Sequence, residues 1–246
     1  MAGSLQCCFL AKMDKPFFLG IGFIRPHLPF YAPRKYWDMY TKEDIAIAEN
    51  RFRPKNAPDA LRGSGEVHYY HDRNIEYNSL EFHTTARHGY YACVSYVDAQ
   101  VGRLLKTLDD LNLRKNTIVV LWGDHGWHLG EHAIWGKHAL FEESLRSPLI
   151  IQYKGLKNPG QRTDSIVESL DVFPTLCELS GLPTPTEAAG VSLKPYIDDV
   201  SAEGHPAISY ARKGKTIRTD RYRLIVHNKG NVELYDHSTE QAETEN

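Results

Sequence analysis

A dense group of potential ligands and charged side chains lies between residues 123 and 138. This segment, GDHGWHLGEHAIWGKH, contains four histidines, two carboxylates, two tryptophans and a lysine. Asp124 and His125 are adjacent, and flanking glycines let the backbone turn sharply, so both side chains could reach one divalent cation. Lys137 could offer a point positive charge to an anion held by that cation. The pattern therefore predicts a cation-assisted site for an anionic group.

An ordinary structural interpretation exists for the same residues. Asp124 could cap a helix, and His125 could be a loop histidine with a satisfied hydrogen bond. We favour the site because a connecting loop does not require such a density of reactive side chains directly after a buried strand.

Two further patterns imitate metal sites. Residues 128–132 match the H-x-x-E-H pattern of inverted zinc proteases, which requires both histidines on one helix face, and Gly130 weakens such a helix. Short matches of this kind arise often by chance. Asp109 and Asp110 look like paired metal ligands, but they fall at the end of a long predicted helix, where a solvated face is the better interpretation.

Another candidate, His27, stands between two prolines in the segment IRPHLPF. Prolines on both sides prevent regular strand pairing, so His27 is expected in a loop just past a strand at residues 16–23. The alternative is a histidine wedged between prolines for packing.

The elements expected to position these residues form an α/β pattern. Apolar residues three and four apart predict a long amphipathic helix over residues 84–113. The run TIVVLW at residues 117–122 predicts a strand covered on both faces in a parallel sheet, with Asp124 and His125 at its carboxyl end. A second such strand is predicted at residues 148–153 and a helix at residues 169–179. Residues 31–81 have no clear period and are expected to form a long surface excursion.

The final stretch has a different pattern. Residues 207–210, 216–227 and 232–235 alternate in polarity and are separated by turn residues, which predicts a small antiparallel sheet. We therefore expect an α/β core over residues 1–190, with a sheet flanked by helices, and a C-terminal antiparallel α+β subdomain over residues 191–246.

Composition excludes several classes of protein. The 246 residues carry 29 Lys and Arg against 31 Asp and Glu, so no global field would gather nucleic acid or an anionic membrane. No apolar run reaches the roughly 20 residues that a membrane span needs. Residues 5–10 lack a preceding basic region and make a poor signal peptide. Cys7, Cys8, Cys93 and Cys177 show neither metal-site spacing nor the density of a disulfide scaffold.

Four segments together resemble the sulfatases, most closely the iduronate-2-sulfatase-like branch. They are KPFFLGIGFIRPHLPF, YYACVSYVDAQVGRLLKTLDDL, TIVVLWGDHGWHLGEHAIWGKH and the late ELYD. The combination of RPH-x-PF with DHGW-x-LGEH-x-x-W-x-K is far more specific than any single short motif. The resemblance implies an alkaline-phosphatase-like superfold with a partial sheet, and hydrolysis of sulfate monoesters, with a sulfated small molecule or glycan as substrate.

Site roles follow from the same resemblance. It implies that Asp124 and His125 are ligands of Ca²⁺, with Mg²⁺ or Mn²⁺ as alternatives, that Lys137 contacts the sulfate group, and that His27 faces the scissile oxygen. Members of this family are commonly periplasmic, secreted or lysosomal. The oligomeric state is open.

The sequence departs from the family pattern in one respect. The formylglycine nucleophile arises from the cysteine of a C-x-P-S-R motif, and none of the four cysteines stands in that motif. The early strand ending in two aspartates, which supplies the other metal ligands, is also missing. We therefore expect a C-terminal portion of a sulfatase that is inactive by itself. A phosphodiesterase or phosphonate hydrolase of the same superfold, and a noncatalytic anion-binding module, are the alternatives.

Overall fold

The computed structural model describes residues 15–58, 65–239 and 242–246. It divides the chain into two compact units, one comprising Met1–Glu49 and Gly65–Thr117, the other Asn50–Ser64 and Ile118–Asn246. Each unit is described by itself. The domain boundary expected near residue 190 stays a prediction. Cys7 and Cys8 lie outside the described residues.

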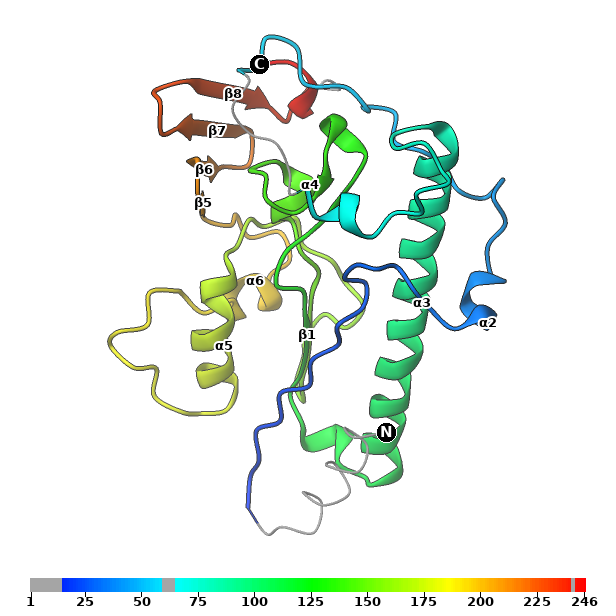
Figure 1. Cartoon of the computed structure of the whole chain (residues 1–246). Coiled ribbons are helices and arrows are strands. Elements are labelled where there is room, and N and C mark those ends of the chain that lie inside the picture. The colour runs from blue at the N-terminus through cyan, green and yellow to red at the C-terminus, as the bar shows by residue number, and fades with distance from the viewer. Residues whose placement is uncertain (1–14, 59–64, 240–241) are drawn as a thin grey trace. The chain divides into compact units, whose positions relative to one another are not determined.

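Helix α3 (Leu80–Asp110) is the main element of the first unit (Figure 1). This helix confirms the one that was predicted from apolar spacing. It begins four residues before the predicted start, because Ser79 caps it. The Ser79 Oγ accepts a hydrogen bond from the Phe82 amide at 3.1 Å, which satisfies a backbone donor that the first turn leaves unpaired.

The short helix α2 (Arg34–Trp37) and the segment before it pack on α3. The rings of Phe30 and Tyr90 meet edge to face, with centroids 5.5 Å apart. Gly89 makes this approach possible, because a Cβ at that position would lie 2.9 Å from the Phe30 Cβ. A 3-10 turn, η1 (Gly65–Tyr69), precedes α3, and η2 (Arg114–Asn116) follows it.

The predicted strand at residues 16–23 is wrong. In the described part of the chain this segment belongs to no β-ladder, and Phe18 is 86% exposed. An apolar run becomes a strand only when another backbone satisfies its hydrogen-bonding groups, and composition alone does not supply that partner.

In the second unit, strand β1 (Val119–Trp122) pairs with β4 (Leu149–Gln152) in an antiparallel register that places Val120 opposite Ile151. Both strands are where the sequence predicted them, but the predicted parallel pairing is wrong. The connection between them holds a hairpin of β2 (His128–Leu129) and β3 (Trp135–Gly136) and one helical turn, α4 (Glu142–Leu145). It provides no crossover helix of the kind that parallel neighbours require.

Beyond β4, the predicted helix at residues 169–179 is present as η4 (Ser169–Asp171) and α5 (Val172–Leu179). The Glu168 and Asp171 side chains form a capping box at its start. A further short helix, α6 (Lys194–Asp198), contacts α5.

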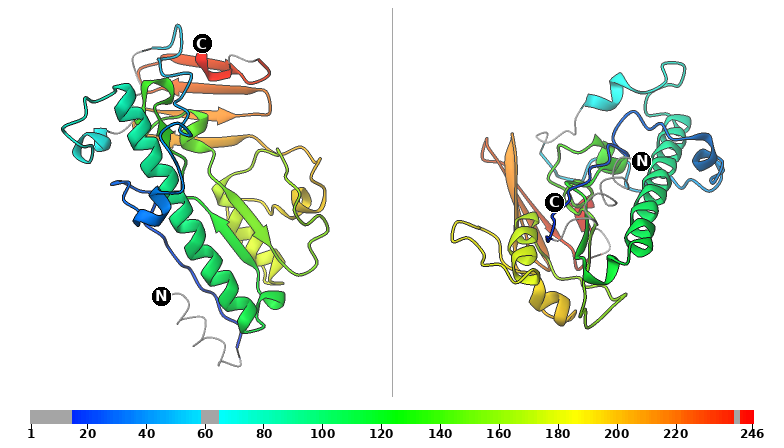
Figure 2. Two further views of the ribbon diagram at one scale, coloured as in Figure 1. Left: turned by 90° about the vertical axis from the view of Figure 1, so that its right-hand side faces the viewer. Right: turned by 90° about the horizontal axis from the view of Figure 1, so that it is seen from below.

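The predicted C-terminal antiparallel sheet is confirmed, and Figure 2 shows its four strands side by side. The strands are β5 (Ala207–Ala211), β6 (Gly214–Arg218), β7 (Tyr222–His227) and β8 (Val232–Asp236), in sequence order, followed by η5 (Ala242–Thr244). Residues 216–227, expected as one strand, belong to two strands with a turn between them. The inner face of the sheet buries Ile225 and Tyr235 against Leu140 and Phe141.

A buried ion network ties this sheet to α4. Arg223 donates to the carboxylates of Glu243 and Glu142, and the Glu142 amide donates to Glu243 Oε2 at 2.8 Å. Burial opposes the ionisation of Glu243, but the hydrogen bond from His237 and the charge of Arg223 outweigh it and lower the pKa of Glu243 to about 2. The charges therefore compensate one another inside the protein.

No helix in the described part of the chain has the length and apolar character to cross a bilayer.

Two glycines of α3 should respond in opposite ways to alanine. Gly102 has open space at its Cβ position, so Gly102→Ala should raise the free energy of unfolding by about 1 kcal/mol through helix propensity. Gly89→Ala would press on Phe30, and overpacking of about 1–3 kcal/mol should cancel or exceed the same gain. Denaturant unfolding of both variants measures the difference. Equal stabilisation by both would show that Phe30 does not pack against Gly89.

Removal of Arg223 should destabilise the protein strongly. Arg223→Met removes the buried guanidinium that pairs with both carboxylates, and breaking a buried pair costs about 3–5 kcal/mol. The folded pKa of Glu243 is about 2, below its ordinary value of 4.5, so its stabilising effect is complete above pH 4.5 and is lost as the pH falls toward 2. The stability of the variant should depend less on pH in that interval.

Arg221→Met is the matched control for this variant. Arg221 pairs with Asp236 on the surface, where water screens the interaction, so a much smaller loss is expected. Equal losses for the two variants would contradict a special role of the buried network.

Candidate functional site

The loop after β1 is held by backbone contacts to the segment before β4. The Gly123 amide donates to the Pro148 carbonyl at 2.9 Å, and the Gly126 amide donates to the Ser144 carbonyl at 2.9 Å. A Cβ at Gly126 would lie only 2.0 Å from the Glu143 carbonyl oxygen. Glycine is thus required at position 126, because any side chain would force the two segments apart.

Asp124 and His125 lie in this loop with the geometry of two ligands for one cation. The His125 Nδ1 donates to the Gly126 carbonyl at 2.7 Å, which leaves the lone pair on Nε2. That Nε2 lies 3.6 Å from Asp124 Oδ2, and the Asp124 side chain is 81% exposed. Adjacent ligands of an octahedral cation with bonds of about 2.4 Å are separated by about 3.4 Å, so the two donors fit a calcium-type ion.

Lys137 lies near this pair through Trp127. The Lys137 Nζ stands 5.4 Å from the centre of the Trp127 ring, and the Trp127 and His125 rings have centroids 6.3 Å apart. A cation over an indole face is attracted by its quadrupole, which restricts where the amine can go. Lys137 and His125 thus both lie near the Trp127 ring, and Asp124 lies beside His125.

His27 lies in the other unit, so its position relative to these three residues stays a prediction. Within its own unit it lies in a bend outside regular structure, as expected, but no strand precedes it at residues 16–23. Its Nδ1 donates to the Leu28 carbonyl at 2.8 Å, and its Nε2 lies 3.4 Å from Glu66 Oε1.

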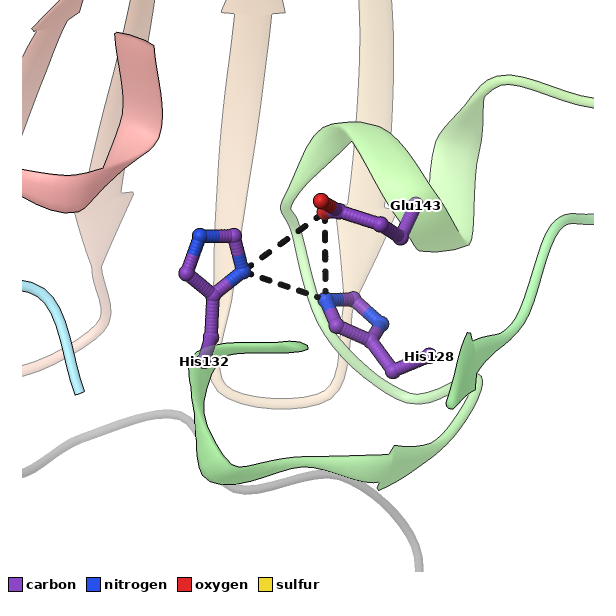
Figure 3. A group of neighbouring side chains, drawn as sticks. All are labelled: His128, His132 and Glu143. Atoms are coloured by element: carbon purple, nitrogen blue, oxygen red, sulfur yellow. Dashed lines mark hydrogen bonds and ion pairs between the residues drawn. The ribbon is translucent and has the colours of Figure 1, made fainter. Parts of the chain in front are cut away.

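Sequence reasoning missed a second group of donors, His128, His132 and Glu143 (Figure 3). The two histidines belong to the H-x-x-E-H pattern, but they lie on β2 and the 3-10 turn η3 (Glu131–Ala133), not on a helix. Glu131 of the pattern instead accepts a hydrogen bond from the Leu129 amide at 2.6 Å. The third member, Glu143, comes from α4, and no spacing rule connects it to the pattern.

Burial shifts the pKa values in this group away from the charged forms. The His128 side chain is fully buried, and desolvation with the neighbouring His132 lowers the pKa of His128 to about 3. Burial also raises the pKa of Glu143 to about 7. Burial also lowers the pKa of His132, so desolvation favours the neutral form of both imidazoles, which carries a lone pair.

The paired aspartates at the end of α3 form ordinary surface ion pairs. Asp110 accepts from Lys106 at 2.7 Å, and Asp109 lies 3.6 Å from Arg114. Both carboxylates are exposed, as expected for a solvated helix face.

Comparison with known proteins shows which family the chain belongs to. The family model described as Sulfatase matches residues 5–182, and that of the C-terminal part of N-sulphoglucosamine sulphohydrolase matches residues 130–246. A sulfatase of Formosa agariphila is 34% identical over 238 residues, which are 96% of this chain and 46% of the relative. Iduronate 2-sulfatase of Mus musculus is 34% identical over 203 residues, covering 69% of this chain and 37% of the relative.

Solved structures show the same fold. A protein in complex with its substrate D-glucosamine-2-N,6-O-disulfate has a TM-score of 0.83 at 21% identity, covering 99% of this chain and 64% of the other. A phosphonate monoester hydrolase from Silicibacter pomeroyi has a TM-score of 0.82 at 23% identity, covering all of this chain (100%) and 55% of the other. This chain thus spans about half the length, or less, of the curated relatives described above. The match of the family model over most of the sequence shows that the chain belongs to the sulfatase family.

Proposed function

We propose that the protein containing this chain is a sulfuric ester hydrolase that acts on sulfate monoesters of a carbohydrate. The observation that carries this proposal is the segment between β1 and β4, in a chain of the sulfatase family: Asp124 lies beside His125, and both His125 and Lys137 lie near the Trp127 ring. The named activity of the iduronate 2-sulfatase relative supports a sulfated sugar as the substrate class.

Each residue has a distinct role in this proposal. Asp124 and His125 hold a divalent cation, because they present one carboxylate oxygen and one imidazole lone pair 3.6 Å apart, and Ca²⁺ is the ion that the family resemblance implies. When bound, this ion withdraws electron density from the nonbridging sulfate oxygens. Lys137 adds a second positive contact, which stabilises the charge-dispersed transition state of sulfuryl transfer.

His27 is proposed to give a proton to the departing oxygen. Hydrolysis breaks the sulfur–oxygen bond of the ester, the alcohol leaves with a proton, and water supplies the oxygen that ends on sulfate. An imidazole can donate that proton near neutral pH because its ordinary pKa lies there. Glu66 Oε1 lies 3.4 Å from the Nε2 of this imidazole.

The nucleophile is proposed to come from polypeptide outside this sequence. Cys93 is fully buried and is followed by Val-Ser-Tyr, and burial raises the pKa of its thiol to about 11. Cys177 is buried and is followed by Glu-Leu-Ser. Neither stands in the C-x-P-S-R motif from which the family makes formylglycine, and the contexts of Cys7 and Cys8 do not match it either.

A phosphonate monoester hydrolase is the second candidate, because a protein of that name has a TM-score of 0.82 to this chain. A cation with a lysine contact suits phosphoryl oxygens as well as sulfuryl oxygens.

Activity of the natural protein containing this sequence should depend on Asp124 and Lys137. With a sulfated monosaccharide as substrate, Asp124→Asn or Lys137→Ala should lower kcat/KM by at least about 100-fold, the usual effect of losing one preorganised electrostatic contact. Free sulfate is the quantity to measure. A phenyl phosphonate monoester assayed in parallel separates the two candidates, because the proposal requires the sulfate ester to give the higher kcat/KM.

Matched controls are available on the surface of the chain. Asp110→Asn removes an exposed carboxylate of α3, and Lys154→Ala removes an exposed lysine after β4. Both should retain the wild-type rate. Wild-type rates for Asp124→Asn and Lys137→Ala as well would refute the proposed site.

Calcium should bind weakly to this chain by itself. Two donors are far fewer than the six to eight oxygen-type ligands that Ca²⁺ prefers, so we expect a Kd of about 1 mM or weaker. Isothermal titration with wild type and Asp124→Asn measures this affinity. Micromolar binding that survives Asp124→Asn would place calcium elsewhere.

A further inference from the structure

We propose that His128, His132 and Glu143 form a second metal site, for a tetrahedral transition-metal ion of the zinc class. The site is separate from the Asp124 and His125 pair and does not rest on the proposed sulfatase activity.

The donor spacing supports this assignment. His128 Nε2 lies 3.4 Å from Glu143 Oε2, His132 Nδ1 lies 3.5 Å from the same oxygen, and the two nitrogens are 3.5 Å apart (Figure 3). A tetrahedral ion with bonds of about 2.0–2.1 Å requires its ligands to be about 3.3–3.4 Å apart. The three atoms thus form a nearly equilateral triangle of the required size, and an ion needs shifts of only about 0.1–0.2 Å to enter.

Hydrogen bonds outside the triangle orient both rings. His128 Nδ1 lies 2.8 Å from the Oγ of buried Ser144, and when Nδ1 donates to that oxygen the lone pair of Nε2 points to the centre. The His132 backbone amide donates to the Asn50 carbonyl at 2.8 Å, and the nitrogen of the Asn50 side-chain amide lies 3.4 Å from His132 Nε2. When that side-chain amide is turned so that its oxygen faces the ring, Nε2 donates to the oxygen and the lone pair of Nδ1 points to the centre. These contacts resemble the outer shell that fixes the tautomer of metal-binding histidines.

The centre of the group lacks a positive charge in the described structure. Glu143 Oε2 is buried and has no hydrogen-bond donor among the described residues, although two imidazole nitrogens face it. Buried polar atoms are nearly always satisfied, so such an oxygen needs an explanation. A bound cation accepts all three lone pairs at once, and two imidazoles with one carboxylate favour zinc over calcium.

The other group of potential ligands in the described structure already contains a positive charge. Glu142, His237 and Glu243 also lie close together, but Arg223 donates to both of these carboxylates. A guanidinium already supplies the positive charge there, so that group carries no metal proposal.

The three ligands come from β2, η3 and α4, so a bound ion would cross-link these short elements. The His132 backbone has a φ of 55°, a left-handed conformation that is unfavourable for a residue with a side chain. It turns the imidazole toward the other two donors. The Glu143 side chain is 29% exposed, whereas both histidines are buried.

Titration of the untagged, chelator-treated chain with Zn²⁺ and Co²⁺ tests this proposal. We expect one equivalent of Zn²⁺ with a Kd below about 10 µM, an affinity that ordinary surface histidines do not reach, and a rise in Tm. Co²⁺ should show the intense visible absorption of a tetrahedral complex. An octahedral Co²⁺ spectrum, or the absence of stoichiometric binding, would overturn the proposal.

Variants assign the binding to these residues. Glu143→Gln keeps the size of the side chain and should weaken Zn²⁺ at least 10-fold, and His132→Gln should do the same. Circular dichroism without metal verifies that each variant folds. If the variant of the buried His132 does not fold, Glu143→Gln alone decides the test. Unchanged affinity in folded Glu143→Gln contradicts the assignment.

Two control variants change a histidine and a glutamate that lie outside the proposed metal site. His138→Ala removes an exposed histidine of the same segment, and Glu131→Gln changes the glutamate of the H-x-x-E-H pattern, and both should keep Zn²⁺ binding. Asp124→Asn should also keep it while losing calcium, which separates this inference from the proposed sulfatase function. Loss of Zn²⁺ binding in Glu131→Gln together with its retention in Glu143→Gln would overturn the assignment of Glu143 as a ligand.

Discussion

The close approach of the backbone at Gly126 to the segment before β4 determines the geometry of both groups of ligands. The Gly126 amide donates to the Ser144 carbonyl, and there is no room for a side chain beside the Glu143 carbonyl. Asp124 and His125 precede this contact in the chain, whereas Ser144 and Glu143 lie on its other side. A change in the separation of the two backbones would therefore move the exposed cation pair and the buried histidine group together.

Glu142 and Glu143 are adjacent on α4, but their side chains lie in different environments and have different roles. Glu142 accepts from Arg223 within a charge-compensated network, which anchors α4 to the C-terminal sheet. Glu143, the next residue, faces two neutral imidazoles, and burial raises its pKa to about 7. Since neighbouring residues of a helical turn point in different directions, a sequence pattern cannot say which of two glutamates pairs with arginine and which joins histidines.

The sequence allowed the prediction of local features but not of long-range partners. The periodicity of α3, the strand before Asp124 and the alternation of the C-terminal strands depend on neighbouring residues, and all three were predicted. Whether β1 and β4 pair parallel or antiparallel depends on the path of the connecting residues 123–148, and the apolar composition of the strands contains no information about that path. The segment 16–23 shows the same limit, because a strand needs a partner. Glu143 was missed because its approach to His132 depends on the left-handed backbone at His132, which no spacing rule predicts.

The exposed pair and the buried group can bind different ions, because their donor atoms and their burial differ. Asp124 is exposed and its partner nitrogen lies 3.6 Å away, so the pair suits a hard cation that completes its shell with further oxygens. The buried group offers two imidazole nitrogens at 3.4–3.5 Å from one carboxylate oxygen, which suits a smaller tetrahedral ion. A tetrahedral ion there would restrain Ser144 through His128, and Ser144 in turn holds Gly126. The buried ion would then act on the exposed pair by preorganisation, since a loop fixed before calcium arrives loses less entropy when calcium binds.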